Sequence, residues 1–132
     1  PLYAALNYDG RIELTPGDPF DVNIIAAFNR HQRTDKGFEP ALGPDAAAAA
    51  ARQFAIVQYE VIQGASDWVF GAQDREIQNE VLAGWASAAR EIGEPLDDVV
   101  NWLTRRRDLV AAGRSAMRVG HVDIFARPTA MR

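Results

Sequence analysis

Apolar residues follow two different spacings along this chain, one typical of strands and one typical of helices. Residues 2–6 form an apolar run and residues 117–126 carry alternating apolar positions, which indicates a strand near each end. In four stretches between them, apolar residues recur every three or four positions, which indicates amphipathic helices. The pattern predicts an α/β fold in the order strand, extended arm, helix, helix, strand, helix, helix, strand.

The first predicted strand is expected to end in a turn at Asn7, Tyr8, Asp9 and Gly10. Asp-Gly is a strong turn signal, and Asn and Asp tolerate the backbone angles that turns require. Residues 11–14 then alternate between polar and apolar types, which predicts a short strand or an extended arm.

Capping and stop signals set the limits of the four predicted helices. Asp18, Asp45 and Asp74 stand where an N-cap residue is expected, and Gly93 and Gly113 stand where helices commonly stop. The predicted helices cover residues 19–33, 46–57, 74–92 and 96–110, with a loop over residues 34–44. Between the second and third helices, residues 59–63 read as a strand that Trp68–Phe70 continues past a bulge or kink.

Composition and charge are those of one globular domain spanning residues 1–132. The chain has a mass of 14.5 kDa, is 48% hydrophobic and carries a net charge of −4, which gives no electrostatic footprint for nucleic acid. The basic run at residues 105–107 is expected to be a solvated helix face. The absence of Cys excludes disulfides, thiolate metal sites and cysteine nucleophiles. No membrane-length apolar stretch or signal peptide is visible, so we expect a cytoplasmic protein with no membrane partner.

The start of the chain suggests the back half of a longer protein. It opens inside an apolar run with no initiator Met and no capping residue in front. A strand that begins at residue 2 is expected to pair with a strand upstream of it.

Three segments resemble the C-terminal half of the class I S-adenosylmethionine-dependent methyltransferases, in particular a bacterial subgroup. They are Leu-Asn-Tyr-Asp-Gly at residues 6–10, Gly-Ala-Ser-Asp-Trp-Val at residues 64–69, and the segment of residues 114–125 that contains His-Val-Asp. The resemblance implies half of a doubly wound, Rossmann-like sheet with three main strands at residues 2–6, 59–70 and 117–126. It further implies that the last strand runs antiparallel in the middle, that helices pack around the sheet, and that residues 18–57 or so form an inserted helical lid.

The resemblance also has consequences for the cofactor and for partners. Family members bind the cofactor with a Gly-rich loop after the first strand, and this chain contains neither GxGxG nor GxGxxG. We therefore expect S-adenosylmethionine to be a cofactor of the intact protein and to have no site in this chain alone. The expected partners are a small-molecule substrate, the missing N-terminal half, and a second copy paired through the exposed first strand.

Four residues are candidates for substrate binding, and no catalytic residue is identified. Asn7 and Tyr8 follow the first predicted strand, and ligands of open α/β sheets bind beyond the carboxyl ends of strands. The alternative is a simple turn. His31 and Arg33 end the first predicted helix, where they either reach an anionic or hydroxylated substrate from the lid or only oppose the helix dipole.

Other chemistry-bearing residues have structural interpretations beside functional ones. His121 and Asp123 share one face of the last strand, which suggests either a metal pair without a third ligand or a buried histidine bonded to a neighbour. Trp85 and Trp102 lie on apolar helix stripes and are expected in the core. Trp68 is also expected in the core, and the alternative for it is an aromatic pocket, because Ser66-Asp67 precedes it at a predicted strand irregularity. The sequence predicts the substrate-side portion of a small-molecule methyltransferase, and the alternative is a non-catalytic α+β interaction or dimerisation module.

Overall fold

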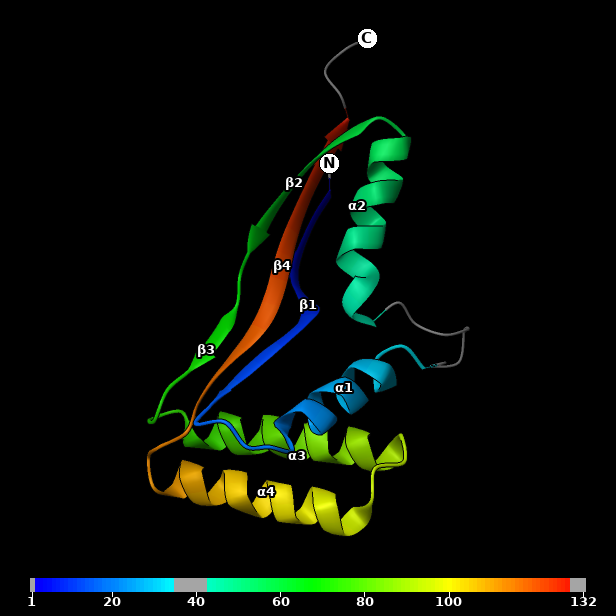
Figure 1. Ribbon diagram of the computed structural model, residues 1–132. Coiled ribbons are helices and arrows are strands. Elements are labelled where there is room, and N and C mark those ends of the chain that lie inside the picture. Colours follow the sequence, from blue (N-terminus) through cyan, green and yellow to red (C-terminus); the bar gives the residue numbers. More distant parts are fainter. Residues whose placement is uncertain (1, 35–42, 129–132) are drawn as a thin grey trace.

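The computed structural model describes residues 2–34 and 43–128, apart from the side chains of residues 2–7 and 47. These residues form a mixed α/β fold with a four-stranded antiparallel sheet and four α-helices (Figure 1). The elements are β1 Leu2–Thr15, α1 Asp21–His31, the 3₁₀ turn η1 Gly43–Asp45, α2 Ala46–Ile56, β2 Tyr59–Ala65, β3 Trp68–Phe70, α3 Arg75–Glu91, α4 Leu96–Ala111 and β4 Ala116–Pro128. The predicted α/β class and the order of its elements are confirmed, whereas most of the predicted loop over residues 34–44 lies outside the described residues.

Strand β4 lies in the middle of the sheet and runs antiparallel to all of its neighbours (Figure 1). β1 pairs along one edge of β4, from Leu2 opposite Ala126 to Thr15 opposite Ala116. β2 and β3 pair one after the other along the opposite edge. The predicted interruption of the middle strand is therefore confirmed, because Ser66 and Asp67 lie outside β2 and β3 and separate these two strands, which share one partner strand.

The predicted turn at residues 7–10 is wrong, because β1 continues through it to Thr15. The pairing with β4 shifts register between Tyr8 and Ile12, so that residues 9–11 stand opposite Gly120 alone. Gly10 adopts a φ of +94°, which residues other than glycine rarely adopt. Because β4 offers a continuous partner, the Asp-Gly signal produces a bulge and the strand does not reverse.

Helix α1 begins two residues later than the predicted start at residue 19. The carboxylate of Asp18 accepts a hydrogen bond of 2.9 Å from the N–H of Phe20, which holds the turn before the helix. Asp21 is the first residue of α1, so Asp18 supports the turn and is not the N-cap residue.

The other helix limits follow the predicted signals. Asp45 and Asp74 occupy the N-cap positions of α2 and α3, although neither carboxylate caps the helix through a side-chain bond. Gly93 and Gly113 follow α3 and α4 with φ values of +107° and +70°, which is the left-handed geometry of a helix stop. None of the helices in the described residues is sufficiently long and apolar to cross a lipid bilayer.

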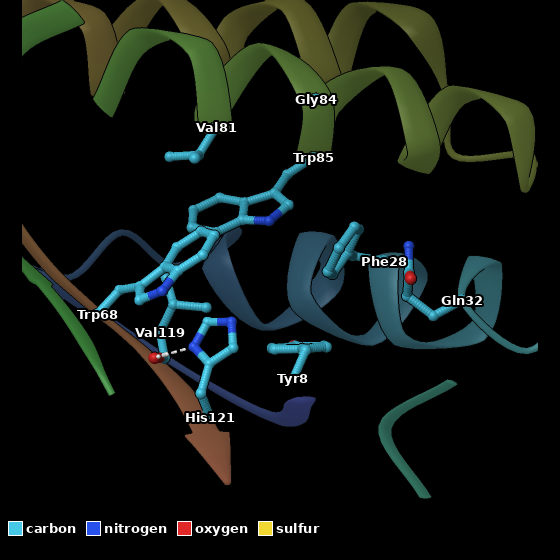
Figure 2. Close-up of a pocket in the computed structure, with 9 residues that line it drawn as sticks. All are labelled: Tyr8, Phe28, Gln32, Trp68, Val81, Gly84, Trp85, Val119 and His121. Carbon is cyan, nitrogen blue, oxygen red and sulfur yellow. Dashed lines mark hydrogen bonds between the residues drawn. The ribbon is translucent and has the colours of Figure 1, made fainter. Parts of the chain in front are cut away.

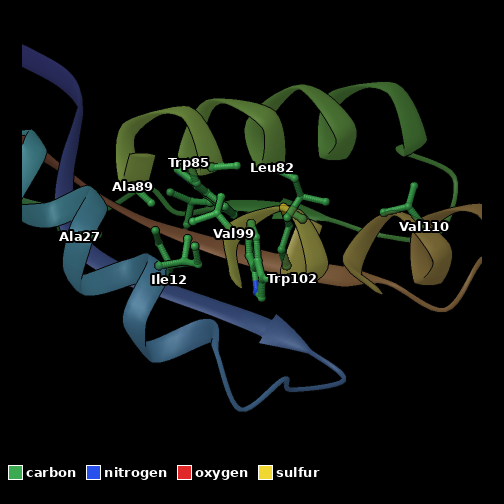
Figure 3. Packing of buried hydrophobic residues seen from close by; sticks show 12 residues of the cluster. Ile12, Ala27, Leu82, Trp85, Ala89, Val99, Trp102 and Val110 are labelled. Atoms are coloured by element: carbon green, nitrogen blue, oxygen red, sulfur yellow. The ribbon is translucent and has the colours of Figure 1, made fainter. Parts of the chain in front are cut away.

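The hydrophobic core lies where α1, α3 and α4 meet one end of the sheet. Figure 1 shows α3 and α4 side by side there, with α1 near them and α2 alongside the other end of the strands. Trp85 and Trp102 are buried in this cluster, as predicted from their helix stripes (Figure 3). Ile12 of β1 and Val119 of β4 join them from the sheet, so the core ties helices to both strands.

The prediction of a solvated face at residues 105–107 is wrong for Arg106, which is 0% exposed. Its guanidinium donates a hydrogen bond to the carbonyl of Pro16 and lies 3.9 Å from the carboxylate of Asp21. Trp102, one helical turn earlier, donates its indole N–H to the same carboxylate at 2.7 Å. Burial lowers the pKa of Arg106, and the carboxylates of Asp21 and Asp18 oppose that effect. The buried face of α4 therefore holds the connection between β1 and α1.

Replacing Gly120 by alanine should destabilise the fold. A Cβ at position 120 would clash with the carboxylate of Asp9 and lie 2.9 Å from the Cβ of Arg11. We expect Gly120→Ala to lower the free energy of unfolding by about 1–3 kcal/mol, as overpacked sites do. Gly64→Ala in β2 is the matched control, since a Cβ there meets nothing within 4 Å. Urea denaturation measures both, and an equal effect of the two substitutions would contradict the close packing of the bulge.

The contribution of Asp18 to stability should depend on pH. Hydrogen bonds from Arg105, at 2.6 Å and 3.1 Å, lower the pKa of this carboxyl group below its usual value, and the N–H of Phe20 adds to the effect. The stabilisation is therefore complete above about pH 4, the usual Asp value, and is lost as the pH falls through the lowered pKa. Asp18→Asn should reduce the urea midpoint more at pH 7 than at pH 2.5. Asp108→Asn, at an exposed position of α4, should show no such difference.

Candidate functional site

A pocket of about 320 Å³ lies between the sheet and the helices α1 and α3 (Figure 2). Its volume is at the small end of the range of ligand pockets, about 300–1,000 Å³. The residues that line it are Tyr8, Phe28, Gln32, Trp68, Val81, Gly84, Trp85, Val119 and His121. None of these described lining residues is an aspartate, glutamate, lysine or arginine, so the pocket is apolar with a few uncharged polar groups.

The regular spacing of each element brings these side chains to one place. On the sheet, Val119 and His121 are two residues apart in β4 and so share a face. Tyr8 of β1 stands directly opposite His121, and Trp68 of β3 stands directly opposite Val119. The floor of the pocket is therefore built by cross-strand neighbours from three strands.

The helices provide the opposite wall of the pocket, because residues four apart in a helix lie on one face. Phe28 and Gln32 are four residues apart at the end of α1, and Val81 and Trp85 are four residues apart in α3, so each pair shares a helix face. The rings of Phe28 and Trp85 meet edge to face, with centroids 6.2 Å apart. Gly84 of α3 also lines the pocket and has no side chain to fill it.

His121 is the polar group set deepest in this site, with only 3% of its surface exposed. Its Nδ1 lies 3.0 Å from the carbonyl oxygen of Val119. Because a carbonyl oxygen only accepts hydrogen bonds, Nδ1 must carry the hydrogen, and in the neutral tautomer that this bond selects, Nε2 is the acceptor. Figure 2 shows the second ring nitrogen directed toward the space below Trp85 and Phe28, and no residue that the structure describes bonds to it.

The ring of His121 is held by aromatic neighbours on both sides. The Trp68 ring lies over it, with centroids 4.3 Å apart and an interplanar angle of 30°. The Tyr8 ring approaches it edge-on at 6.2 Å. These contacts fix the plane of the imidazole and hence the direction of Nε2.

Hydrogen bonds between residues 66–67 and β4 hold the backbone around His121. The carboxylate of Asp67 accepts a bond of 3.0 Å from the N–H of His121, and the N–H of Ser66 donates to the His121 carbonyl at 2.9 Å. The Ser66 hydroxyl bonds to the carboxylate of Asp123 at 2.7 Å. His121 is thus the buried, bonded histidine that the sequence allowed, and the described residues contain no cluster of three or more potential metal ligands.

Asp67 also joins β3 to the bulge of β1. Arg11 donates to its carboxylate at 2.9 Å, and Arg118 lies 3.6 Å from it. The N–H of His121 is the largest cause of its lowered pKa, and Arg11 and Arg118 add to it, so this carboxylate stays ionised at neutral pH. The negative charge of Asp67 therefore stabilises the backbone around His121.

Of the four predicted site residues, Tyr8 lines the pocket. Its hydroxyl donates to the side-chain oxygen of Asn29 at 2.7 Å, and its ring lies 5.4 Å from that of Phe28. Burial raises the pKa of the Tyr8 phenol, and the charge of Asp9 adds to this, so the group remains protonated and is no base. Asn7 lies in β1 opposite Val122 of β4, but the structure does not describe the side chain of Asn7.

His31 and Arg33 do not line the pocket. The Nε2 of His31 lies 2.8 Å from the carboxylate of Glu91, which joins the end of α1 to α3. Arg33 donates to the carboxylate of Asp45 at 3.1 Å and to the carbonyl of Asn29 at 3.1 Å. The structure therefore places both side chains in contacts between elements, and a role in substrate binding stays a prediction.

The sequence did not single out Phe28 or Gln32, and it offered His121 only as one of a metal pair or as a buried histidine. Trp85 was expected in the core and is buried there, and the same ring also lines the pocket. The expectation of a core position is wrong for Trp68, which is 37% exposed and lines the pocket instead. The signal for His121 was its alternation with Val119, but that pattern alone does not show which strand lies opposite. Comparisons with protein-family models, with curated proteins and with solved structures find no match to this chain.

Replacing Tyr8 by phenylalanine tests the bond that fixes the pocket floor to α1. We expect the loss of the hydroxyl to lower the free energy of unfolding by about 1 kcal/mol, because the Asn29 oxygen loses its donor. Tyr59→Phe in β2 is the control, since the Tyr59 ring also packs on an aromatic neighbour, Phe54. Thermal unfolding of both variants measures the effect, and equal losses would argue against the bond.

Proposed function

We propose that this chain is the substrate-side portion of an S-adenosylmethionine-dependent methyltransferase that acts on a small molecule. The observation that carries the proposal is the strand order, in which the last strand, β4, runs antiparallel between the first strand and the middle strands. The family that the sequence resembles has its last strand in the same place and direction.

The contacts between the resembling segments add support. Residues 66–68 of one segment touch residues 121 and 123 of the other through hydrogen bonds and a ring stack. Trp68 and His121 line the pocket, so two residues of the resembling segments also belong to the candidate site. The size of the pocket fits a small-molecule substrate.

The residues present do not fit the methyl donor. The ten glycines form no GxGxG or GxGxxG loop, and no acidic residue among the described pocket residues is available for ribose hydroxyls. We therefore place S-adenosylmethionine in the intact protein outside this chain. The role of this chain is to bind the substrate, exclude water and orient the reacting atom, which is where much of the catalysis of such transfers arises.

A titration with S-adenosylhomocysteine, together with an intact mass, tests the proposal. The chain alone should show no binding, whereas the protein that the native cell makes should bind the ligand and be longer by about 100–150 residues, half of a doubly wound domain. The added sequence should contain the Gly-rich loop. A native mass of 14.5 kDa, or binding by this chain alone, would contradict the proposal.

One observation favours the alternative, a non-catalytic interaction module. β1 lies at the edge of the sheet, and among the described residues it pairs with β4 only. An open edge of this kind can pair with a strand of a second copy. Sedimentation of the protein at its native length separates the two functions, because the module should form a dimer without binding S-adenosylhomocysteine.

A further inference from the structure

We propose that the pocket binds a small, neutral, planar molecule that donates one hydrogen bond, through a hydroxyl or ring N–H, to Nε2 of His121. The identification of this molecule as the substrate rests on the proposed function. The pocket alone supports the binding.

The ligand is neutral because nothing in the described lining carries an opposite charge. The ionic groups around the pocket already have partners, since Glu91 contacts His31, Asp45 contacts Arg33, and Asp67 contacts Arg11. A charged ligand would lose its hydration without gaining a counter-charge, which is costly in an apolar site.

The ligand is small and planar because aromatic rings surround a limited space. Figure 2 shows Trp85 and Phe28 on one side of that space, and Trp68, Tyr8 and His121 on the other. Aromatic side chains favour an aromatic ligand through stacked and edge-to-face contacts. The volume of about 320 Å³ suits a ligand of one or two rings better than an extended chain.

The ligand donates a hydrogen bond because His121 offers an acceptor. Nδ1 donates to the Val119 carbonyl, and in the tautomer that this bond selects Nε2 has no hydrogen to donate. The hydrogen of the Tyr8 hydroxyl is committed to Asn29. Nε2 faces the pocket and bonds to no residue that the structure describes, so a ligand O–H or N–H can pair with it.

Three indoles test the two chemical requirements on the protein at its native length, in the absence of any methyl donor. Indole is neutral and has one N–H, 1-methylindole lacks the N–H, and indole-3-carboxylate adds a negative charge. We expect indole to bind, and each of the other two to bind about tenfold more weakly, the cost of an unpaired buried group or an unpaired charge. Competition measured by ligand-observed NMR gives the affinities.

Two conservative variants show whether the weaker binding of 1-methylindole comes from the lost hydrogen bond or from the size of its methyl group. His121→Asn can keep the bond to the Val119 carbonyl but removes the acceptor at the Nε2 position, so the preference for indole over 1-methylindole should disappear. His121→Gln places an amide oxygen near that position and should restore part of the preference. A preference unchanged in His121→Asn would overturn the proposal.

A measurement on the unaltered protein covers the case in which these variants fail to fold. The chain has two histidines, and a His31→Gln variant assigns their ring ¹⁵N signals. Indole should shift the Nε2 signal of His121, whereas 1-methylindole should leave it nearly unchanged. Equal affinities for indole and 1-methylindole, or tighter binding of the carboxylate, would overturn the proposal. If the native-length protein binds S-adenosylhomocysteine but not indole, this inference is wrong and the proposed function is retained. If it binds indole but not S-adenosylhomocysteine, the inference is retained and the proposed function is wrong.

Discussion

The pairing of β4 on both of its edges is the constraint on which the rest of the structure depends. Every backbone N–H and C=O buried in a sheet needs a partner, and β4 provides partners to each of the other strands. β1, β2 and β3 pair with β4 and not with one another. The last segment of the chain is therefore required before the earlier strands form a sheet.

The same constraint explains the geometry of the pocket. Since β1 must follow β4, its extra residues form a bulge against Gly120, and Tyr8 comes to lie opposite His121. Since β2 and β3 share one edge of β4, the gap between them places Asp67 against the backbone of His121. His121 is thereby fixed by its neighbours on the sheet, and its Nε2 has one direction in which to act.

The errors in the sequence interpretation share one cause. Tyr8 was selected because it was expected beyond the end of a strand, yet it lines the pocket from within a continuous strand. Arg106 was expected on a solvated face, yet it is buried because the connection after β1 offers it the carbonyl of Pro16. In both cases the local sequence pattern did not show which distant segment packs against the residue, and that segment decides whether the side chain is exposed.

The sequence by itself determined the helices, their stops and the order of the strands along the chain. These features depend on spacing and on the backbone preferences of residues such as Gly93 and Gly113, which act within one or two turns of chain. The site was decided only by the tertiary structure. Tyr8, Trp68 and His121 are separated by more than 50 residues from one another, and no local rule sets the register that brings their rings together. That register depends on how the backbone groups of β4 pair with all of the other strands, so it is a property of the whole sheet.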